Sequence, residues 1–410
     1  MLEHFAAIML FPRGDQTRNE TETHLGTEPF WRAYKIMKVL LQSRKTLFSV
    51  PGGDTIQVLK TAEYLRLIGI LVDISVDLEP RIEAYDLVHL FNLTRTQETL
   101  AQATYARKHG KPVLLSPIYV DYSEYDTKAR IGSAGVVARA TSQATREYLK
   151  IAARAVLNGE INRGTLHVLS HGVRSSQRDL IRMTSWLLPN SESEMQRVMR
   201  DFPEATKLNY TVVPNAVDAR LFSDAVIPES AYKDCVLSVA RIEGRKGQLN
   251  LVRALRSTDI KLVLIGKPAP NHMRYFEKVL QEMGKDCEYL GEVPHDQLPK
   301  YYAACKVHAL VSWMETTGLT SLEAAAMGAN IVITDKGDTR EYFGDSAFYC
   351  DPMSVESIRQ AVLDAHRAPR NDDLRRLVFE KYTWERAATE TLKAYNQVLC
   401  PHDSQFVPGN

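Results

Sequence analysis

The chain has 410 residues, enough for two or three domains, of which 44% are hydrophobic and 25% are charged. This composition is typical of a globular protein and excludes disordered, fibrous and membrane-spanning classes. Lysine plus arginine number 51 and aspartate plus glutamate number 50, so the net charge of +1 provides no global field to hold nucleic acid or an anionic membrane. We therefore expect no nucleic-acid partner.

The sequence also bears on compartment and metal binding. The early apolar run over residues 5–11 is too short to cross a bilayer, and it lacks the basic flank and cleavage site of a secretory signal. The cysteines form no Cys-x-x-Cys pair, and none precedes Cys235, which favours reduced, buried thiols over a disulfide framework or a zinc site. We expect a soluble, cytoplasmic protein with no metal site.

Residues 1–44 are interpreted as a helical extension that precedes the first strand. Between residues 30 and 45 the sequence is apolar and basic and contains no acid. A basic amphipathic helix would suit peripheral contact with an anionic membrane surface. We favour the alternative, a helix packed on the first domain, because the apolar residues encircle much of the helix instead of forming one stripe.

From residue 45 onward, short apolar runs alternate with amphipathic segments of helical length, which indicates βαβ units and a parallel sheet. The first predicted strand, 45–50, leads into Pro51-Gly52-Gly53 and a helix that begins near Asp54. Further strands are predicted at 70–74, 87–90, 113–115, 185–189 and 210–213, and helices at 97–109 and 138–157. These elements make a Rossmann-like domain over residues 45–216.

Residues 214–230 contain prolines and little periodic apolar content, which predicts a linker. A second βαβ series follows and makes a domain over residues 217–380. Its strands are predicted at 235–239, 261–265, 287–290, 307–311 and 330–334, and its helices at 248–256, 275–283, 298–304 and 319–327. The sequence therefore predicts an α/β protein with two Rossmann-like domains facing a cleft, and a loose tail at 401–410.

One loop and helix of the second domain suit a nucleotide. The helix begins after Gly318, and its unpaired first-turn N–H groups, at Leu319 and Thr320, are placed to bind phosphate. Glu323 lies in the first turns, where a carboxylate can accept hydrogen bonds from both hydroxyls of a ribose. Glu315, on the preceding loop, would face the group beyond the phosphates. An ordinary capped helix with two solvated carboxylates is the alternative.

A second loop, residues 240–247, follows the first strand of this domain and carries Arg241, Arg245 and Lys246. Arginine offers a planar fork and lysine a point charge, and both suit a diphosphate whose negative charge grows as a bond to it breaks. A solvated basic turn is the alternative for this loop taken alone.

Together the two loops resemble the donor domain of retaining GT-B glycosyltransferases, specifically glycosyltransferase family 4. That family has an Arg and a Lys-Gly after the first strand of the domain, and an E-x7-E with Gly-Leu before a helix. The matching positions here are Arg241, Lys246-Gly247, Glu315, Gly318-Leu319-Thr320 and Glu323. Residues 213–218 are similar to the family's linker, whereas Asn330 stands where a proline is usual. The resemblance covers roughly residues 185–400.

The resemblance implies GT-B architecture, with a helix over 381–400 crossing back to the first domain. It implies transfer with retention of configuration from a nucleotide diphosphate sugar to a saccharide or lipid-linked acceptor, without a cofactor or metal. Arg241, Lys246 and Glu315 would be catalytic, with the diphosphate charge neutralised by the two cations. The donor would also contact residues 318–320 and Glu323.

The first domain matches the family less closely. Gly52 and Gly53 resemble its glycine-rich loop, whose backbone approaches the donor phosphates because no side chain intervenes. The family often has an acceptor-side histidine that cannot be carried over here. His89 lies in an apolar strand and is interpreted as a core histidine. His171, on a predicted loop facing the cleft, is the proposed acceptor contact in its place.

The function predicted from the sequence is a glycosyltransferase of hexosyltransferase type, acting in glycan or glycoconjugate biosynthesis. Two other classes stay open. A sugar-nucleotide 2-epimerase or hydrolase shares the architecture but needs acid and base groups that we do not identify. A non-catalytic sugar-nucleotide-binding protein could dispense with Glu315, which is present.

Overall fold

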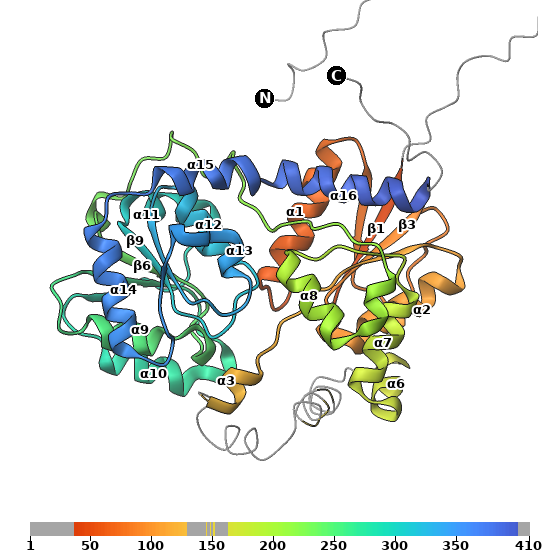
Figure 1. Ribbon diagram of the computed structural model, residues 1–410, viewed down its shortest axis with the longest axis horizontal. Coiled ribbons are helices and arrows are strands. Elements are labelled where there is room, and N and C mark those ends of the chain that lie inside the picture. The colour runs from red at the N-terminus through yellow and green to blue at the C-terminus, as the bar shows by residue number, and fades with distance from the viewer. Residues whose placement is uncertain (1–36, 129–144, 146–147, 149–150, 152–162, 401–410) are drawn as a thin grey trace, which may run out of the picture. The chain divides into compact units, whose positions relative to one another are not determined.

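The computed structural model describes residues 37–128, 145, 148, 151 and 163–400. Its first half, residues 37–216, contains a parallel sheet flanked by helices (Figure 1). The strands are β1 (Lys38–Gln42), β2 (Leu71–Ser75), β3 (Leu87–Phe91), β4 (Val113–Ser116) and β5 (Trp186–Leu187). The helices are α1 (Gly53–Leu67), α2 (Thr96–Lys108), α3 (Ser123–Lys128), α6 (Arg163–His171), α7 (Val173–Met183) and α8 (Glu192–Asp201).

The second half, residues 217–383, contains another parallel sheet with helices on both faces (Figure 1). Its strands are β6 (Val236–Val239), β7 (Leu262–Ile265), β8 (Cys287–Tyr289), β9 (Val307–Leu310), β10 (Asn330–Ile333) and β11 (Phe348–Tyr349). Its helices are α9 (Gln248–Leu255), α10 (Met273–Glu282), α11 (Leu298–Ala304), α12 (Leu319–Ala326), α13 (Thr339–Phe343), α14 (Val355–Arg367) and α15 (Asp372–Lys381). Helix α16 (Trp384–Leu399) follows.

Both sheets have the strand order of doubly wound folds. The first sheet runs β2-β1-β3-β4-β5 and the second runs β8-β7-β6-β9-β10-β11. The order reverses between β1 and β3 in the first sheet, and between β6 and β9 in the second. In such sheets a ligand crevice opens at the carboxyl ends of the strands beside this switch point. The prediction of two Rossmann-like domains is therefore confirmed.

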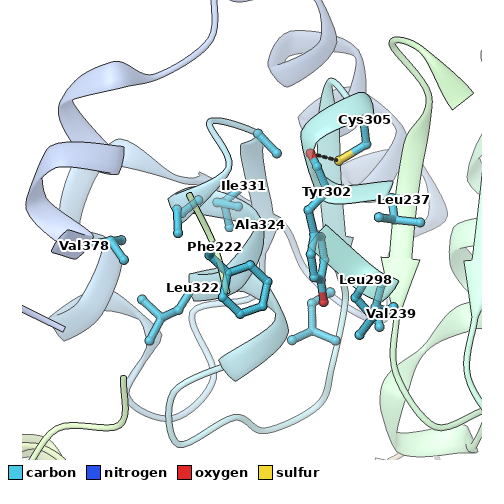
Figure 2. Close-up of a cluster of buried hydrophobic side chains, with 14 of the residues drawn as sticks. Phe222, Leu237, Val239, Leu298, Tyr302, Cys305, Leu322, Ala324, Ile331 and Val378 are labelled. Atoms are coloured by element: carbon cyan, nitrogen blue, oxygen red, sulfur yellow. Dashed lines mark hydrogen bonds between the residues drawn. The ribbon is translucent and has the colours of Figure 1, made fainter. Parts of the chain in front are cut away.

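Each sheet is covered on both faces, which explains why its central strands are mostly apolar runs. All four residues of β7 and of β10 are buried. Figure 2 shows the cluster on one face of the second sheet, where Tyr302 from α11 packs with Leu322 from α12 and Ile331 from β10. Burial at this site raises the pKa of the Tyr302 hydroxyl well above its usual value, so the ring is a neutral hydrogen-bond donor.

Helix α16 completes the first half although it follows the second half in the chain. It packs along α1 (Figure 1), and Trp384 and Tyr395 are buried in the same core as Val39 of β1. The chain passes from the first half to the second near Val217 and returns near Tyr382, and at this point the Val217 N–H donates to the Tyr382 carbonyl at 2.9 Å. The predicted return helix is thus present.

The start of the first domain was predicted wrongly. Strand β1 occupies Lys38–Gln42, within the region predicted as an extension and a helix over 30–45, while residues 45–49 form turns instead of a strand. Val39 pairs with both β2 and β3, so β1 is a central strand whose sequence lacks polar alternation. The remainder of the predicted extension, residues 1–36, and the tail 401–410 lie outside the described residues.

The buried side chain of Arg44 explains the turns that follow β1. Its Nε donates to Asp54 Oδ2 at 2.6 Å, Nη1 donates to the Thr46 carbonyl at 2.7 Å, and Nη2 donates to the Val50 carbonyl at 2.9 Å. These bonds satisfy main-chain groups that a strand would have paired with a neighbour. The predicted strand at 210–213 is likewise reduced to one bridge, between Leu187 and Tyr210. Most of the predicted helix 138–157 lies outside the described residues.

Candidate active site

The predicted donor residues lie on the two loops that leave the switch point of the second sheet. One loop follows β6 and runs through the 3₁₀ turn Gly244–Lys246 into α9. The other follows β9 and runs through Glu315 to Gly318, where α12 begins. Because β6 and β9 are parallel neighbours, the loops leave the sheet at the same edge.

The loop after β6 requires glycine where it turns into α9. Gly247 has φ of +72°, and a Cβ at this position would lie 2.4 Å from the Val311 carbonyl oxygen. An ion pair within the turn also stabilises it, since Arg245 Nε donates to Glu243 Oε1 at 2.7 Å. The guanidinium of Arg245 lies over the Tyr122 ring, 4.9 Å from its centroid. Arg245 is therefore engaged within the protein, although the sequence grouped it with the other cations.

Lys246 and Glu315 are brought together by the fold. Lys246 Nζ forms an ion pair with Glu315 Oε1, and the two side chains are 21% and 11% exposed. The residues are 69 positions apart in the sequence, so only the pairing of β6 and β9 places them in contact. The pair supplies one cation and one hydrogen-bond acceptor at the carboxyl edge of the sheet.

The start of α12 has the geometry that the sequence predicted. Gly318 has φ of +75°, and a Cβ there would lie 3.1 Å from the Ile333 side chain, so the tight approach to the sheet favours glycine. The helix N-terminus follows directly, with Leu319 and Thr320 in its first turn. First-turn amides of an α-helix have no acceptor within the helix, and the dipole adds positive potential there.

Glu323 is buried, and its carboxylate is held by two residues that the sequence analysis missed. His295 Nε2 lies 2.6 Å from Glu323 Oε1, and the Tyr302 hydroxyl donates to Oε2 at 3.0 Å. The hydrogen bond to Glu323 outweighs burial and raises the pKa of His295. A carboxylate has about four acceptor sites, so two donors leave capacity for ligand hydroxyls.

His295 also borders an open cleft of about 660 Å³, which is lined by both halves. Lys60 of α1 and Asp218 of the linker face it, joined by an ion pair of 2.7 Å. Although burial raises the pKa of Asp218, hydrogen bonds from Arg220, Lys60 and Tyr64 outweigh that effect and lower it. The cleft therefore contains a fixed network of charges beside Glu323.

The glycine-rich loop of the first half meets the donor loops directly. Arg241 Nη2 donates to the Pro51 carbonyl at 2.8 Å. A Cβ on Gly52 would lie 3.4 Å from Arg241 Nη2 and 3.0 Å from Asp54 Oδ1, whereas one on Gly53 would meet only Leu319, at 3.9 Å. Within the protein, the tighter of the two glycine positions is therefore Gly52.

The predicted loop at His171 is wrong, whereas its role as an acceptor contact stays a prediction. His171 is the last residue of α6 and not part of a loop, and its exposed ring stacks on His167 at 4.2 Å between centroids. By contrast, His89 is a core histidine, as predicted, because its ring nitrogens lie 2.8 Å from the Tyr395 hydroxyl and 2.9 Å from Ser116 Oγ. Burial lowers the pKa of His89 to about 3, which keeps it neutral.

Most of the second half matches one known protein family. Residues 222–382 match the family described as glycosyl transferases group 1. This matched segment contains both donor loops and Glu323, together with its partners His295 and Tyr302. The match thus contains the predicted donor-side residues of the second half, whereas Gly52, Gly53 and His171 lie outside it.

Two curated relatives are a lipopolysaccharide transferase and an O-antigen chain transferase. A lipopolysaccharide 1,2-N-acetylglucosaminetransferase of Salmonella typhimurium is 30% identical over 173 residues, which cover 37% of this chain and 45% of that protein. The O-antigen chain mannosyltransferase B of Escherichia coli is 31% identical over 114 residues, covering 26% of this chain and 29% of that protein. The chain therefore spans less than half the length of either relative.

Solved structures extend the likeness to both halves. Sucrose-phosphate synthase from Thermosynechococcus elongatus has a TM-score of 0.66 at 15% identity, covering 89% of this chain and 100% of that chain. Anabaena HepE, solved in complex with UDP and glucose, has a TM-score of 0.61 at 16% identity, covering 88% and 100%. These likenesses show the fold, which is GT-B. Domain match and fold together support a GT-B glycosyltransferase.

The structure also bears on metals and membranes. Among the described residues, no three His, Cys, Asp or Glu side chains gather in a way that would hold a metal ion. No helix in that part of the chain is long and apolar enough to cross a membrane. Of residues 30–45, for which membrane contact was the less favoured interpretation, 30–36 lie outside the described residues and Lys38–Gln42 form strand β1.

Proposed function

We propose that this protein transfers a hexosyl unit from a nucleoside diphosphate sugar to a saccharide or lipid-linked acceptor in glycan or glycoconjugate biosynthesis. The observation that carries the proposal is the convergence of Arg241, the Lys246–Glu315 pair, the start of α12 and Glu323 around one switch point. Support also comes from the neighbour HepE, whose structures contain UDP and UDP-glucose.

Each group has a role in this proposal. Glu323 accepts hydrogen bonds from the ribose hydroxyls, and the α12 amides bind the diphosphate. Arg241 and Lys246 neutralise charge on the diphosphate as the bond from the sugar C1 to the phosphate oxygen breaks. The acceptor oxygen forms the new bond to C1, and its proton passes to the leaving phosphate oxygen. Glu315 accepts hydrogen bonds from the transferred sugar.

We also propose that transfer retains the anomeric configuration and needs neither metal nor cofactor, as in glycosyltransferase family 4. The resemblance of the donor loops supports this part, together with the two cations that can take the place of a metal in charge neutralisation. We place the reaction in the cytoplasm. The free, buried thiols of Cys235, Cys305 and Cys350 suit a reducing compartment.

A panel of nucleotide sugars tests this function. Thermal shift identifies the donor, because a ligand that binds only the folded state raises the Tm. Proton NMR of the product then gives its anomeric configuration, and added EDTA should leave the rate unchanged. Release of nucleoside diphosphate without any acceptor would instead indicate a hydrolase or an epimerase. Binding without turnover for every acceptor class would indicate a sugar-nucleotide-binding protein.

A further inference from the structure

A short loop of the second half, residues 336–338, is tied to the main chain of Glu315. The Glu315 N–H donates to the Lys336 carbonyl at 3.1 Å, and the Asp338 N–H donates to the Glu315 carbonyl at 3.0 Å. Gly337 lies between them with φ of +94°, and a Cβ there would lie 2.0 Å from the Glu315 carbonyl oxygen. The position of Glu315 therefore depends on the position of loop 336–338.

One end of this loop is held by Arg197 of α8, in the first half. Arg197 Nη2 donates to Asp338 Oδ2 at 2.9 Å, and Nη1 also bonds Asp338 Oδ1. The Asp338 side chain is 0% exposed and that of Arg197 is 13% exposed, so the fork-to-fork pair is shielded from water. Arg197 also donates to the Tyr119 carbonyl at 3.3 Å, which fixes its guanidinium to the first half.

The other end of the loop is held by Glu124 of α3, which precedes the second half in sequence but lies beside it, with Tyr125 of α3 packed near Trp313 (Figure 1). Glu124 Oε1 lies 3.0 Å from Lys336 Nζ, with the side chains 33% and 30% exposed. Arg197 of α8 thus presents a cation to Asp338, and α3 presents an anion to Lys336. Opposite charges at the two ends specify one alignment of the loop, because a shift by two residues would place like charges together.

We propose that Arg197 and Glu124 are positioning residues for sugar transfer. They hold both ends of loop 336–338, which holds the Glu315 main chain, so the first half sets the place of the Glu315 carboxylate and of its partner Lys246. This inference rests on the proposed function, since it takes Glu315 to contact the transferred sugar. Nucleotide binding at Glu323 does not involve loop 336–338. Contact between the halves therefore affects the rate of sugar transfer and not the affinity for the donor nucleotide.

The first test measures the link from the first half to Glu315 in the free full-length protein. Amide hydrogen exchange of the peptides that contain Glu315 and Asp338 should quicken in Arg197→Met and, less strongly, in Glu124→Gln. The control is Arg200→Met, on the same helix, whose side chain is 63% exposed and pairs with Asp201. Unchanged exchange in both test variants would overturn the inference, whether or not a substrate is known.

Glu124→Gln should keep the fold, because the ion pair that it breaks is partly exposed. Arg197→Met is more destabilising, because it leaves the buried Asp338 carboxylate without its partner Arg197. If Arg197→Met does not fold, Arg197→Lys takes its place, since it keeps the charge and loses the fork. In that case faster exchange in Arg197→Lys and Glu124→Gln supports the inference, and unchanged exchange in both overturns it.

The second test separates positioning from donor binding. In steady-state transfer, Arg197→Met should lower kcat by roughly tenfold to a hundredfold, as expected when a reacting group is displaced. The Kd for the nucleoside diphosphate should stay at the wild-type value, and Arg197→Lys should recover part of kcat. A wild-type kcat in Arg197→Met, or an equal loss in Arg200→Met, would overturn the inference. A wild-type protein that transfers no sugar would refute the proposed function instead.

Discussion

Replacing each of two carboxylates by its amide should separate ribose binding from sugar binding. Glu323→Gln should weaken binding of the nucleoside diphosphate product, whereas Glu315→Gln should leave it nearly unchanged. The physical reason lies in their partners. Glu323 is buried and already accepts from His295 and the Tyr302 hydroxyl, so the amide must turn its NH₂ toward one of these groups and loses an acceptor.

The size of the Glu323 effect follows from the hydrogen bonds at stake. A hydrogen bond to a charged group contributes about 1.5–3 kcal/mol, and the substitution removes the charge from each ribose contact. One such loss weakens binding by roughly 10- to 150-fold. Glu315→Gln instead releases Lys246 from its ion pair and frees that cation for the diphosphate, which offsets any indirect loss.

Isothermal titration calorimetry with the nucleoside diphosphate selected by the thermal-shift panel measures both affinities. Glu282→Gln is the matched control, because Glu282 pairs with Arg253 away from the two donor loops and should change nothing. Circular dichroism shows whether each variant keeps its fold. Equal weakening by Glu323→Gln and Glu315→Gln would refute the assignment of separate roles.

Three further outcomes are expected. Arg241→Ala and Lys246→Ala should each lower kcat more than they raise KM, with about 2–4 kcal/mol lost in the transition state, and an effect on KM alone in steady-state kinetics would contradict this. Gly247→Ala should destabilise the fold by more than the roughly 1–2 kcal/mol cost of its φ of +72°, since its Cβ would lie 2.4 Å from the Val311 carbonyl oxygen, as urea unfolding would show. Burial raises the pKa of Glu194 to about 7, although two backbone hydrogen bonds lower it. The protonated Glu194 side chain therefore stabilises the fold below pH 4.5, and this stabilisation is lost as the pH rises through 7. The stability of Glu194→Gln relative to wild type should therefore rise over that range by on the order of 3 kcal/mol, and a flat difference would show that Glu194 does not titrate there.

The second half was predictable as far as β10, because local pattern and tertiary structure agree there, whereas α13, β11, α14 and α15 were not predicted. The four central strands β6, β7, β9 and β10 are buried on both faces and appear as short apolar runs, and the helices between them keep a helical period. Strand β1 has the same apolar character, but basic residues flank it. A central strand and a buried helical segment cannot be distinguished by periodicity in so short a run.

The partners of the site residues could not be read from the sequence, because they meet only through the fold. His295 and Tyr302 lie 28 and 21 residues before Glu323. Arg197 is 141 residues from Asp338, and nothing local in either segment indicates a buried ion pair. The sequence indicated a close approach at Gly52 and Gly53 together, and the tighter of the two positions depends on where the Asp54 and Arg241 side chains lie.

The position of α16 has a consequence for the order in which the protein is synthesised. The Tyr395 hydroxyl bonds His89 from 306 residues away, and Trp384 fills the core that β1 and α1 leave open. On the ribosome, the first sheet therefore emerges with one apolar face uncovered and waits for the whole second half to be translated. A nascent chain stalled before Trp384 should bind chaperones through that face, and a separately supplied peptide of residues 383–400 should compete for it.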